Sequence, residues 1–170
     1  MGIAITILIA IAAGGLWALA LRGLRRRRSV IPAPREVHRV LRAYTAGRWD
    51  TVIEDAPGCL DLRSSDDAQW RAALELALGH ALVQRDRNAE AVGHLEIGLA
   101  RQAALHSTGG TPPAPTAEAK MRHMLGYALA ATGRPADARR EYDRALAIAG
   151  IDDEVRRRLT AAVAALDETG

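Results

Sequence analysis

The side chains with the most reactive chemistry in this sequence are five histidines and one cysteine. The histidines are His38, His80, His94, His106 and His123. No two of them have the interval that would place both imidazoles on one helix face beside a metal ion. No glycine-rich loop of the kind that cradles phosphates is present either. The sequence therefore predicts that the protein is not an enzyme and needs no metal or cofactor.

The one cysteine, Cys59, also gives no indication of a catalytic or metal site. A single cysteine can form neither an intramolecular disulfide nor a cysteine-based zinc site. It follows Pro57 and Gly58 in an apolar segment, which favours a buried, inert thiol over a nucleophile. A chain without a disulfide framework fits a reducing compartment.

The positive charge of the chain is concentrated near its N-terminus. Five arginines lie between Arg22 and Arg28, and no acidic residue precedes Glu36. Without these five, 18 of the 23 basic residues stand against 20 acidic ones, so the remainder is close to neutral. A near-neutral domain offers little to a phosphate backbone, and we expect no nucleic-acid partner. Only one basic residue is a lysine, Lys120, a bias typical of high-GC bacterial genomes.

Residues Ile3 to Leu21 form an uncharged stretch long enough to cross a bilayer. As a helix its 19 residues would span about 28 Å, close to the roughly 30 Å of the hydrocarbon core. Trp17 lies near its end, where an indole favours the membrane interface. The arginines that follow should stay on the cytoplasmic side. This pattern predicts a single-pass plasma (inner) membrane protein, with an anchor and basic arm over 1–28 and a cytoplasmic C-terminal domain.

Two further interpretations of this stretch stay open. Ala18-Leu19-Ala20 resembles a signal-peptidase site, and cleavage there would leave a periplasmic or secreted domain, although the basic residues that normally precede such a stretch are missing. Ala10, Gly14 and Ala18 recur every four residues, a spacing that permits close helix–helix approach and a homo-oligomer. Alanine and glycine are also common filler in such helices.

The rest of the chain is predicted to be a series of helices, so the fold class is all-α. The prolines of 29–34 predict an extended linker. Aromatic residues make up 4% and Phe is absent, so the core must be built from Leu, Ala, Val and Ile. No segment alternates with the period of two that strands require. The predicted breaks between helices over 35–168 are Gly47, 64–67, 86–88, 107–116, 133–135 and Gly150, with Asp152 capping the last helix.

Two helix pairs have similar sequences, 72–100 and 119–147. In each, Leu-Gly is followed by His or an aromatic residue and then by Ala-Leu, and small and large apolar residues recur at matching offsets after a turn. In the first pair these are Leu78, Gly79, Leu82, Ala91, Leu95 and Gly98; in the second they are Leu125, Gly126, Leu129, Ala138, Tyr142 and Ala145. Small residues let paired helices approach closely, and large ones fill the space between them.

This pattern resembles the tetratricopeptide repeat. The resemblance covers about 120 of the 170 residues and is best over 119–152, weaker over 72–105 and degenerate over 33–63. It departs from the family in lacking the first-helix Trp and in spacing the turns 39 and 47 residues apart, where 34 is usual. The resemblance implies an α-solenoid of about three helical hairpins over 35–168, closed by a capping helix at 152–167.

Tetratricopeptide arrays bind peptides or protein surfaces in a concave groove lined by the first helix of each unit. The resemblance therefore implies a membrane-anchored adaptor or scaffold that binds a partner protein. The groove positions it implies are Tyr44, His80, Gln84, Lys120, His123 and Tyr127. Each also has a structural interpretation, in which Tyr127 packs on a neighbouring repeat and Lys120 is solvated.

The sequence disfavours one class of partner and leaves one alternative function open. The paired Lys and Asn with which some family members bind the C-terminal carboxylates of chaperones are missing, because the only Asn is Asn88 in a turn. The alternative function is a structural or assembly factor of a membrane complex, in which the chain associates with itself.

Overall fold

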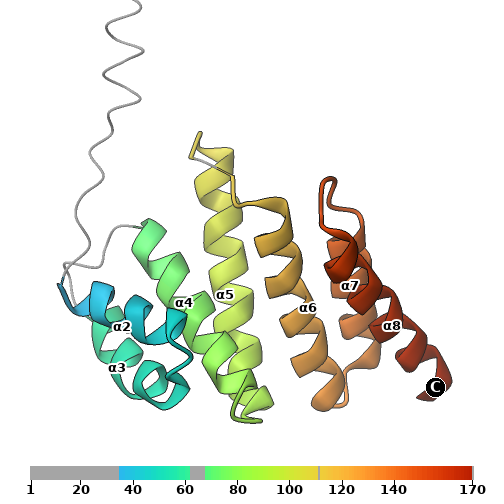
Figure 1. Cartoon of the computed structure of the whole chain (residues 1–170), viewed down its shortest axis with the longest axis horizontal. Coiled ribbons are helices and arrows are strands. Elements are labelled where there is room, and N and C mark those ends of the chain that lie inside the picture. Colours follow the sequence, from blue (N-terminus) through green and yellow to red (C-terminus); the bar gives the residue numbers. More distant parts are fainter. Residues whose placement is uncertain (1–34, 62–67, 111, 170) are drawn as a thin grey trace, which may run out of the picture. The chain divides into compact units, whose positions relative to one another are not determined.

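The computed structural model describes residues 35–61, 68–110 and 112–169. The chain divides into two units, Met1–Pro32 and Ala33–Gly170, and every described residue belongs to the second. The described residues form helices and connecting turns, with no strand among them, so the prediction of an all-α fold is confirmed. Seven helices follow one another along this unit (Figure 1). They are α2 (Arg35–Thr45), α3 (Trp49–Asp61), α4 (Ala68–Val83), α5 (Asn88–Ser107), α6 (Pro115–Ala131), α7 (Pro135–Leu146) and α8 (Asp153–Thr169).

The first six helices form three hairpins, and all three use the same turn. The turn residue has a positive φ in each, 67° at Gly47, 56° at Asp86 and 76° at Gly133. The backbone N–H of the next residue donates to the carbonyl five residues back, which is the six-to-one bond of a glycine-type helix end. These bonds are Arg48 to Ala43, Arg87 to Leu82 and Arg134 to Leu129, each 2.9 Å long. Asp adopts this conformation at a cost that Gly does not pay.

Glycines let the two helices of a hairpin pack closely. A Cβ on Gly79 would lie 2.7 Å from the Leu95 side chain, and one on Gly126 would lie 2.3 Å from the Tyr142 ring. On the partner helix α5, a Cβ on Gly98 would lie 2.7 Å from the Leu76 side chain. The sequence therefore identified the residues that set this close approach.

A polar bridge joins the two helices of each hairpin, and in the second and third hairpins it lies at matching positions. Glu75 on α4 lies 2.7 Å from His94 on α5, and Arg122 on α6 lies 3.1 Å from Glu141 on α7. Both pairs are 19 residues apart, but the acidic partner has moved from the first helix to the second. In the first hairpin Arg39 pairs with Asp55 at 3.3 Å. These bridges satisfy the buried carboxylates of Glu75 and Glu141.

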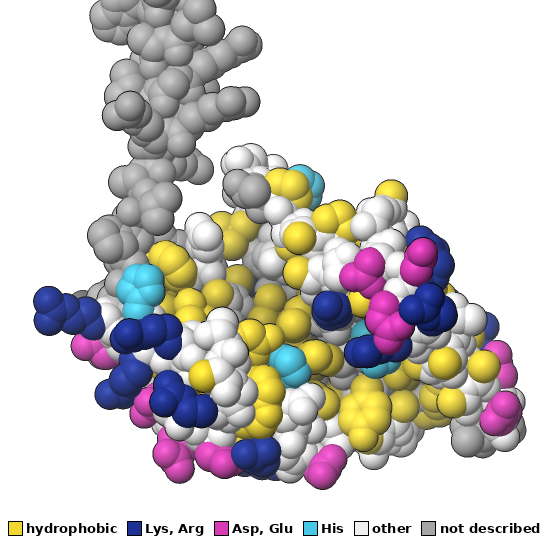
Figure 2. All heavy atoms as spheres, viewed as in Figure 1, with side chains coloured by type: hydrophobic (Ala, Val, Ile, Leu, Met, Phe, Trp, Pro, Cys, Tyr) yellow, Lys and Arg dark blue, Asp and Glu magenta, His cyan; other side chains and the backbone are white. Residues whose placement is uncertain are grey.

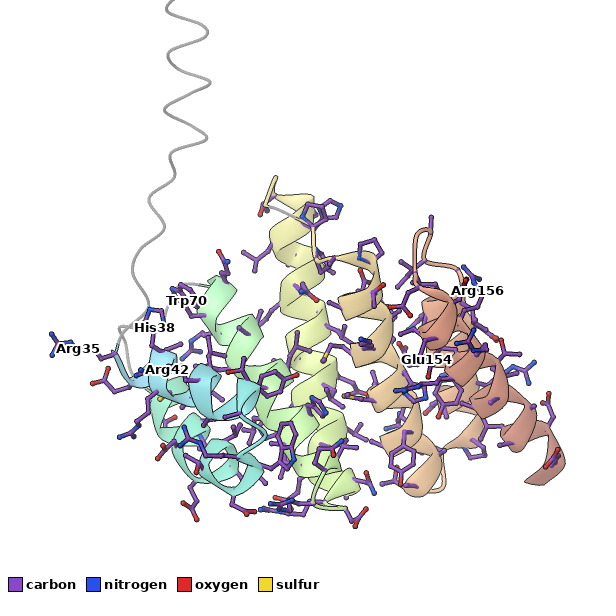
Figure 3. All side chains as sticks on the ribbon, viewed as in Figure 1. Arg35, His38, Arg42, Trp70, Glu154 and Arg156 are labelled. Atoms are coloured by element: carbon purple, nitrogen blue, oxygen red, sulfur yellow. The ribbon has the colours of Figure 1, made fainter. Side chains whose placement is uncertain are left out.

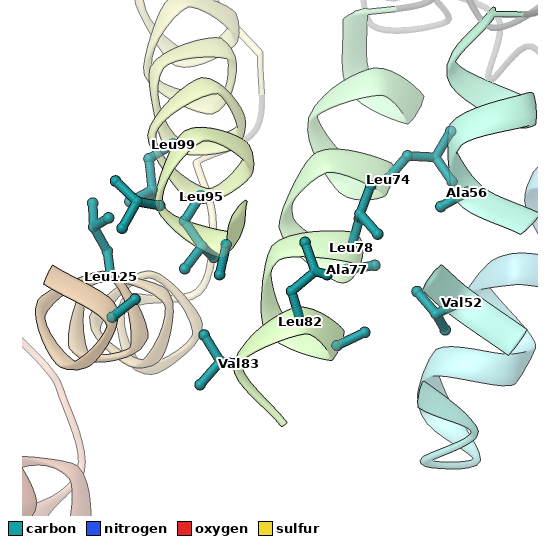
Figure 4. Packing of buried hydrophobic residues seen from close by; sticks show 14 of the residues in the cluster. Val52, Ala56, Leu74, Ala77, Leu78, Leu82, Val83, Leu95, Leu99 and Leu125 are labelled. Carbon is teal, nitrogen blue, oxygen red and sulfur yellow. The ribbon is translucent and has the colours of Figure 1, made fainter. Parts of the chain in front are cut away.

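The hydrophobic core runs continuously through the hairpins. Figure 4 shows α4 between its neighbours, with Leu74 and Leu78 near Val52 and Ala56 of α3 on one side. Leu82 and Val83 lead to Leu95 and Leu125 on the other. Cys59 is part of this core, and burial, followed by the charge of Asp55, raises the pKa of its thiol. A protonated, buried thiol is a poor nucleophile.

Helix α8 closes the array. The Asp152 side chain accepts a hydrogen bond of 2.8 Å from the Val155 N–H, so the predicted cap is confirmed. Val155 and Leu159 are buried against α7 and α6, whereas Arg156 and Thr160 are exposed. A helix with one apolar and one polar side can end a stack of hairpins without leaving an apolar surface uncovered.

The predicted fold class needs one correction, because it included a membrane-spanning helix. Among residues 35–61, 68–110 and 112–169, no helix is long and apolar enough to cross a membrane. The longest, α5, has 20 residues but carries Glu90, Glu96 and Arg101, whereas a span needs about 20 apolar residues. The predicted span Ile3 to Leu21, its Ala10, Gly14 and Ala18 stripe, the basic arm and the linker 29–34 lie outside the described residues.

Candidate functional site

The first helices of the hairpins form one layer of the array. Each helix packs on the next along the chain, and α2 also contacts α4, α4 contacts α6, and α6 contacts α8. Among the described helices, no comparable contact joins α3 to α5 or α5 to α7. The layer of α2, α4, α6 and α8 is therefore the tighter one, and the array curves towards it. We call the exposed side of α2, α4 and α6 in this layer the inner face.

Counting back from the turn residues Gly47, Asp86 and Gly133 gives equivalent positions on the three inner helices. Six residues before the turn lie Leu41, His80 and Tyr127, and two before it lie Thr45, Gln84 and Ala131. Thirteen before it lie Ala73 and Lys120, and nine before it lie His38, Ala77 and Met124. These intervals repeat every three or four residues, so they follow one side of each helix. Four of the six predicted groove residues, His80, Gln84, Lys120 and Tyr127, share this side.

Tyr127 is the most exposed aromatic side chain on the inner face. Its exposed fraction is 47%, and the only other exposed large hydrophobic residue in the described part of the chain is Ile97, at 44%, on the second-layer helix α5. Met124 and His123, three and four residues before Tyr127 on the same helix, are only half exposed. Tyr127 therefore offers an aromatic surface that no neighbouring repeat covers.

Tyr44 and His80 are brought together rather than left open to a ligand. The Tyr44 hydroxyl lies 2.8 Å from His80 Nδ1, and the Gln84 amide nitrogen lies 3.3 Å from His80 Nε2. Trp49, from the start of α3, packs on both rings, with centroids 5.8 Å from Tyr44 and 5.0 Å from His80. The cluster of Tyr44, Trp49, His80 and Gln84 therefore joins the first hairpin to the second.

One neutral tautomer of His80 satisfies both contacts. With its proton on Nδ1, His80 donates to the Tyr44 hydroxyl oxygen and accepts from the Gln84 amide at Nε2. A second proton, on His80 Nε2, would place one N–H donor against the N–H donor of the Gln84 amide, and that hydrogen bond would be lost. Burial lowers the pKa of His80 and raises the pKa of the Tyr44 hydroxyl, so both side chains stay neutral near pH 7.

His123 is placed inside its hairpin. It lies ten residues before its turn, the position that Leu76 holds in the second hairpin, and its ring centroid is 5.6 Å from that of Tyr142 on α7. Burial, followed by the charge of Arg158, lowers the pKa of His123. Burial, followed by the charge of Tyr127, raises the pKa of Tyr142 to about 12. His123 is thus a packing residue with a partly open edge.

Two residues of the inner face, His38 and Trp70, were not among the predicted groove residues. Their ring centroids lie 6.2 Å apart, joining the start of α2 to the start of α4. Both are labelled in Figure 3, beside Arg35 and Arg42. Counting from the turn would have found His38, because it shares its position with Met124. Trp70, sixteen residues before its turn, continues the same spacing, but α6 carries the small Ala117 there and α2 begins later, so comparing the repeats gives no signal for it.

The middle of the face seen in Figure 2 is apolar and recessed. Hydrophobic side chains gather there with histidines among them, and charged side chains lie mainly around the edge. The register agrees with a recess, because α4 carries the half-buried Ala73 and the buried Ala77 where α6 carries the larger Lys120 and Met124. A large apolar side chain from a ligand would find room above α4.

No cluster of metal ligands accompanies this face. Within the part of the chain that the structure describes, no three His, Cys, Asp or Glu side chains gather in a way that could hold a metal ion. The arrangement provides an apolar recess, an exposed aromatic ring and hydrogen-bonding side chains at its edge, which are features of a binding surface.

The chain matches no protein-family model and no curated protein sequence. The tetratricopeptide resemblance therefore stays a prediction from the sequence.

Proposed function

We propose that this protein is an adaptor or scaffold whose helical repeats bind a short segment of a partner protein on the inner face of α2, α4 and α6. The observation that carries the proposal is the position of Tyr127. It is 47% exposed at the edge of an apolar recess, on the layer towards which the array curves. Exposed aromatic residues beside a recess are the usual anchors of protein interfaces.

The repeat spacing at the C-terminal end supports a tetratricopeptide array. Val155, Leu159 and Ala162 of α8 follow Met121, Leu125 and Ala128 of α6 at a constant interval of 34 residues. This is the period of the tetratricopeptide family. In such arrays the concave layer is the binding surface, and here that layer corresponds to the tighter one of α2, α4 and α6.

Self-assembly by end-to-end stacking is the weaker alternative. The exposed end of α2 carries Arg35 and Arg42, and the exposed side of α8 carries Arg156 and Arg157. Helix α8 also carries Asp153, Glu154, Asp167 and Glu168, so charge alone does not keep the two ends apart. Neither end exposes a large apolar side chain of the kind that joins the hairpins internally, since among the described residues only Ile97 and Tyr127 are large, apolar and exposed.

The proposal is tested by peptide selection. The full-length chain, held in mild detergent because of its apolar residues 3–21, is used to select binders from a random-peptide display library. We expect the selected peptides to bind Tyr127→Ala about tenfold or more weakly than the wild type. Ile97→Ala, which removes an equally exposed apolar side chain from α5, is the matched control and should bind normally.

A further inference from the structure

We infer that the partner segment is acidic, with carboxylates on both sides of a large apolar residue and most of them over α2. This inference rests on the proposed function and names the chemistry of the partner. It comes from the charges that the inner helices leave without partners.

The unpaired charges of the inner helices are positive except for Glu36, which lies on the side of α2 towards α3. Among the described residues, no carboxylate lies within ion-pair distance of Arg35, Arg42 or Lys120. The acidic residues of the same helices are Glu36, Glu75 and Glu118, and none of them neutralises this face. Glu75 and Glu118 are engaged by His94 and Arg122, and Glu36 is close enough to Cys59 on α3 to raise its pKa.

The arginines of α2 hold positions that are apolar in the other hairpins. Twelve, eight and five residues before the turn, α4 and α6 carry the side chains that pack on the preceding hairpin. These are Leu74, Leu78 and Ala81 on α4, and Met121, Leu125 and Ala128 on α6. At the same positions α2 carries Arg35, Arg39 and Arg42, which we call the basic edge.

The basic edge is continuous with the apolar recess. Arg42 Nε lies 3.4 Å from the His38 carbonyl oxygen, and the His38 ring lies beside Trp70 at the start of α4 (Figure 3). A segment that leaves the recess over Trp70 therefore passes His38 and reaches two guanidinium groups. Arginine pairs with carboxylates in planar, bidentate geometry, which favours Asp or Glu over a neutral side chain there.

Helix spacing predicts where the acidic residues of the segment lie. Packed helices are about 8–10 Å apart, so α2 and α6 each lie about 8–10 Å from the recess over α4. An extended chain advances about 3.3 Å per residue. An anchor seated over Ala73 would therefore have carboxylates about three residues away on each side, one towards the basic edge and one towards Lys120.

The test uses the peptides selected on the full-length chain. We expect enrichment of a large apolar residue with Asp or Glu about three residues to either side. The double variant Arg35→Gln/Arg42→Gln should bind these peptides about tenfold more weakly, and added salt should reduce the difference. The control Arg140→Gln/Arg157→Gln removes the same charge from exposed positions on α7 and α8 and should bind normally.

Each other outcome overturns a different statement. Neutral or basic peptides that depend on Tyr127 but not on Arg35 and Arg42 would overturn the acidic partner and leave the proposed function standing. Equal binding of a selected peptide and its scrambled counterpart would overturn the predicted spacing and indicate unspecific attraction of negative charge. Peptides that do not depend on Tyr127 at all would overturn the proposed function itself.

Discussion

At the scale of single residues, the glycines inside the helices carry the sharpest structural information. Gly126 and Gly93 are both helical, but a Cβ on Gly126 would lie 2.3 Å from Tyr142, whereas one on Gly93 would meet nothing within 4 Å. Alanine is favoured over glycine by about 1 kcal/mol in a helix interior. The two sites therefore separate helix propensity from packing.

We predict that Gly126→Ala destabilises the protein and Gly93→Ala does not. Overpacking typically costs about 1–3 kcal/mol, which exceeds the gain in propensity at Gly126. At Gly93 only the gain remains, so unfolding should shift to slightly higher denaturant. Urea titration of the full-length variants, followed by helical circular dichroism, measures both. A stabilising Gly126→Ala would show that the hairpin is not closely packed.

The half-buried histidines His80 and His123 predict how stability depends on pH. His80 and His123 have pKa values lowered from 6.5 in the folded chain, so the unfolded chain binds their protons more readily. Their contribution to stability is complete above about pH 6.5 and is lost as the pH falls below that value. The denaturation midpoint should thus drop between about pH 7.5 and 5.5.

Replacing His80 with Gln removes its part of this dependence. His80→Gln should lower stability at high pH by breaking the contact with Tyr44, but it should flatten the drop towards pH 5.5. His106→Gln, at an exposed position on α5, is the control and should leave the pH profile unchanged. A profile that His80→Gln leaves as steep as the wild type would contradict the neutral His80 described above.

At the scale of elements, the polar bridges between paired helices hold the register of each hairpin. Glu141 is 7% exposed, and its carboxylate is shared by Arg122 and Arg144. Losing one partner of a buried charged network leaves the other unsatisfied. The same role in the second hairpin falls to Glu75 and His94.

We expect Glu141→Gln to lower the free energy of unfolding by about 1–3 kcal/mol. Glu90→Gln breaks the fully exposed pair with Arg87 and should produce no measurable change. Equilibrium denaturation of the two variants compares them directly. Equal effects would mean that burial of the Arg122–Glu141 bridge contributes nothing.

Sequence reasoning located the turns and caps better than the helix faces. The positive φ of Gly133, the first-turn position of Pro135 and the cap at Asp152 follow from local chemistry that the sequence displays. His123 was assigned to the groove, but successive helical residues differ by about 100°, so an error of one position turns a groove residue into a packing residue. Only the contact with Tyr142 settles that choice.

The length between turns also had a structural cause that the sequence did not reveal. The extra length of the second interval was expected in its one long predicted break, 107–116, because 64–67 lies in the first interval. Part of it lies instead in α5, which has 20 residues where α3 has 13 and α7 has 12. Alanines and leucines extend this helix to Ser107 because nothing in 100–106 stops it.

At the scale of the whole repeat unit, the two ends and the inner face have different roles. The basic edge of α2 and the polar side of α8 end the stack, while the curvature towards α2, α4 and α6 creates one recessed surface. The sequence indicated an array and most of the residues on that surface. It could not place Trp49 and Trp70 beside His80 and His38, because those contacts join different hairpins.

The central claim is that a partner segment occupies the inner face, and the affinity of one selected peptide for two variants tests it most directly. Fluorescence anisotropy with the labelled peptide should show binding to Tyr127→Ala weakened by about tenfold or more. The same peptide should bind Ile97→Ala as tightly as the wild type. Equal affinities for wild type and Tyr127→Ala, or a loss confined to Ile97→Ala, would contradict the claim and move the binding surface to the other layer of helices.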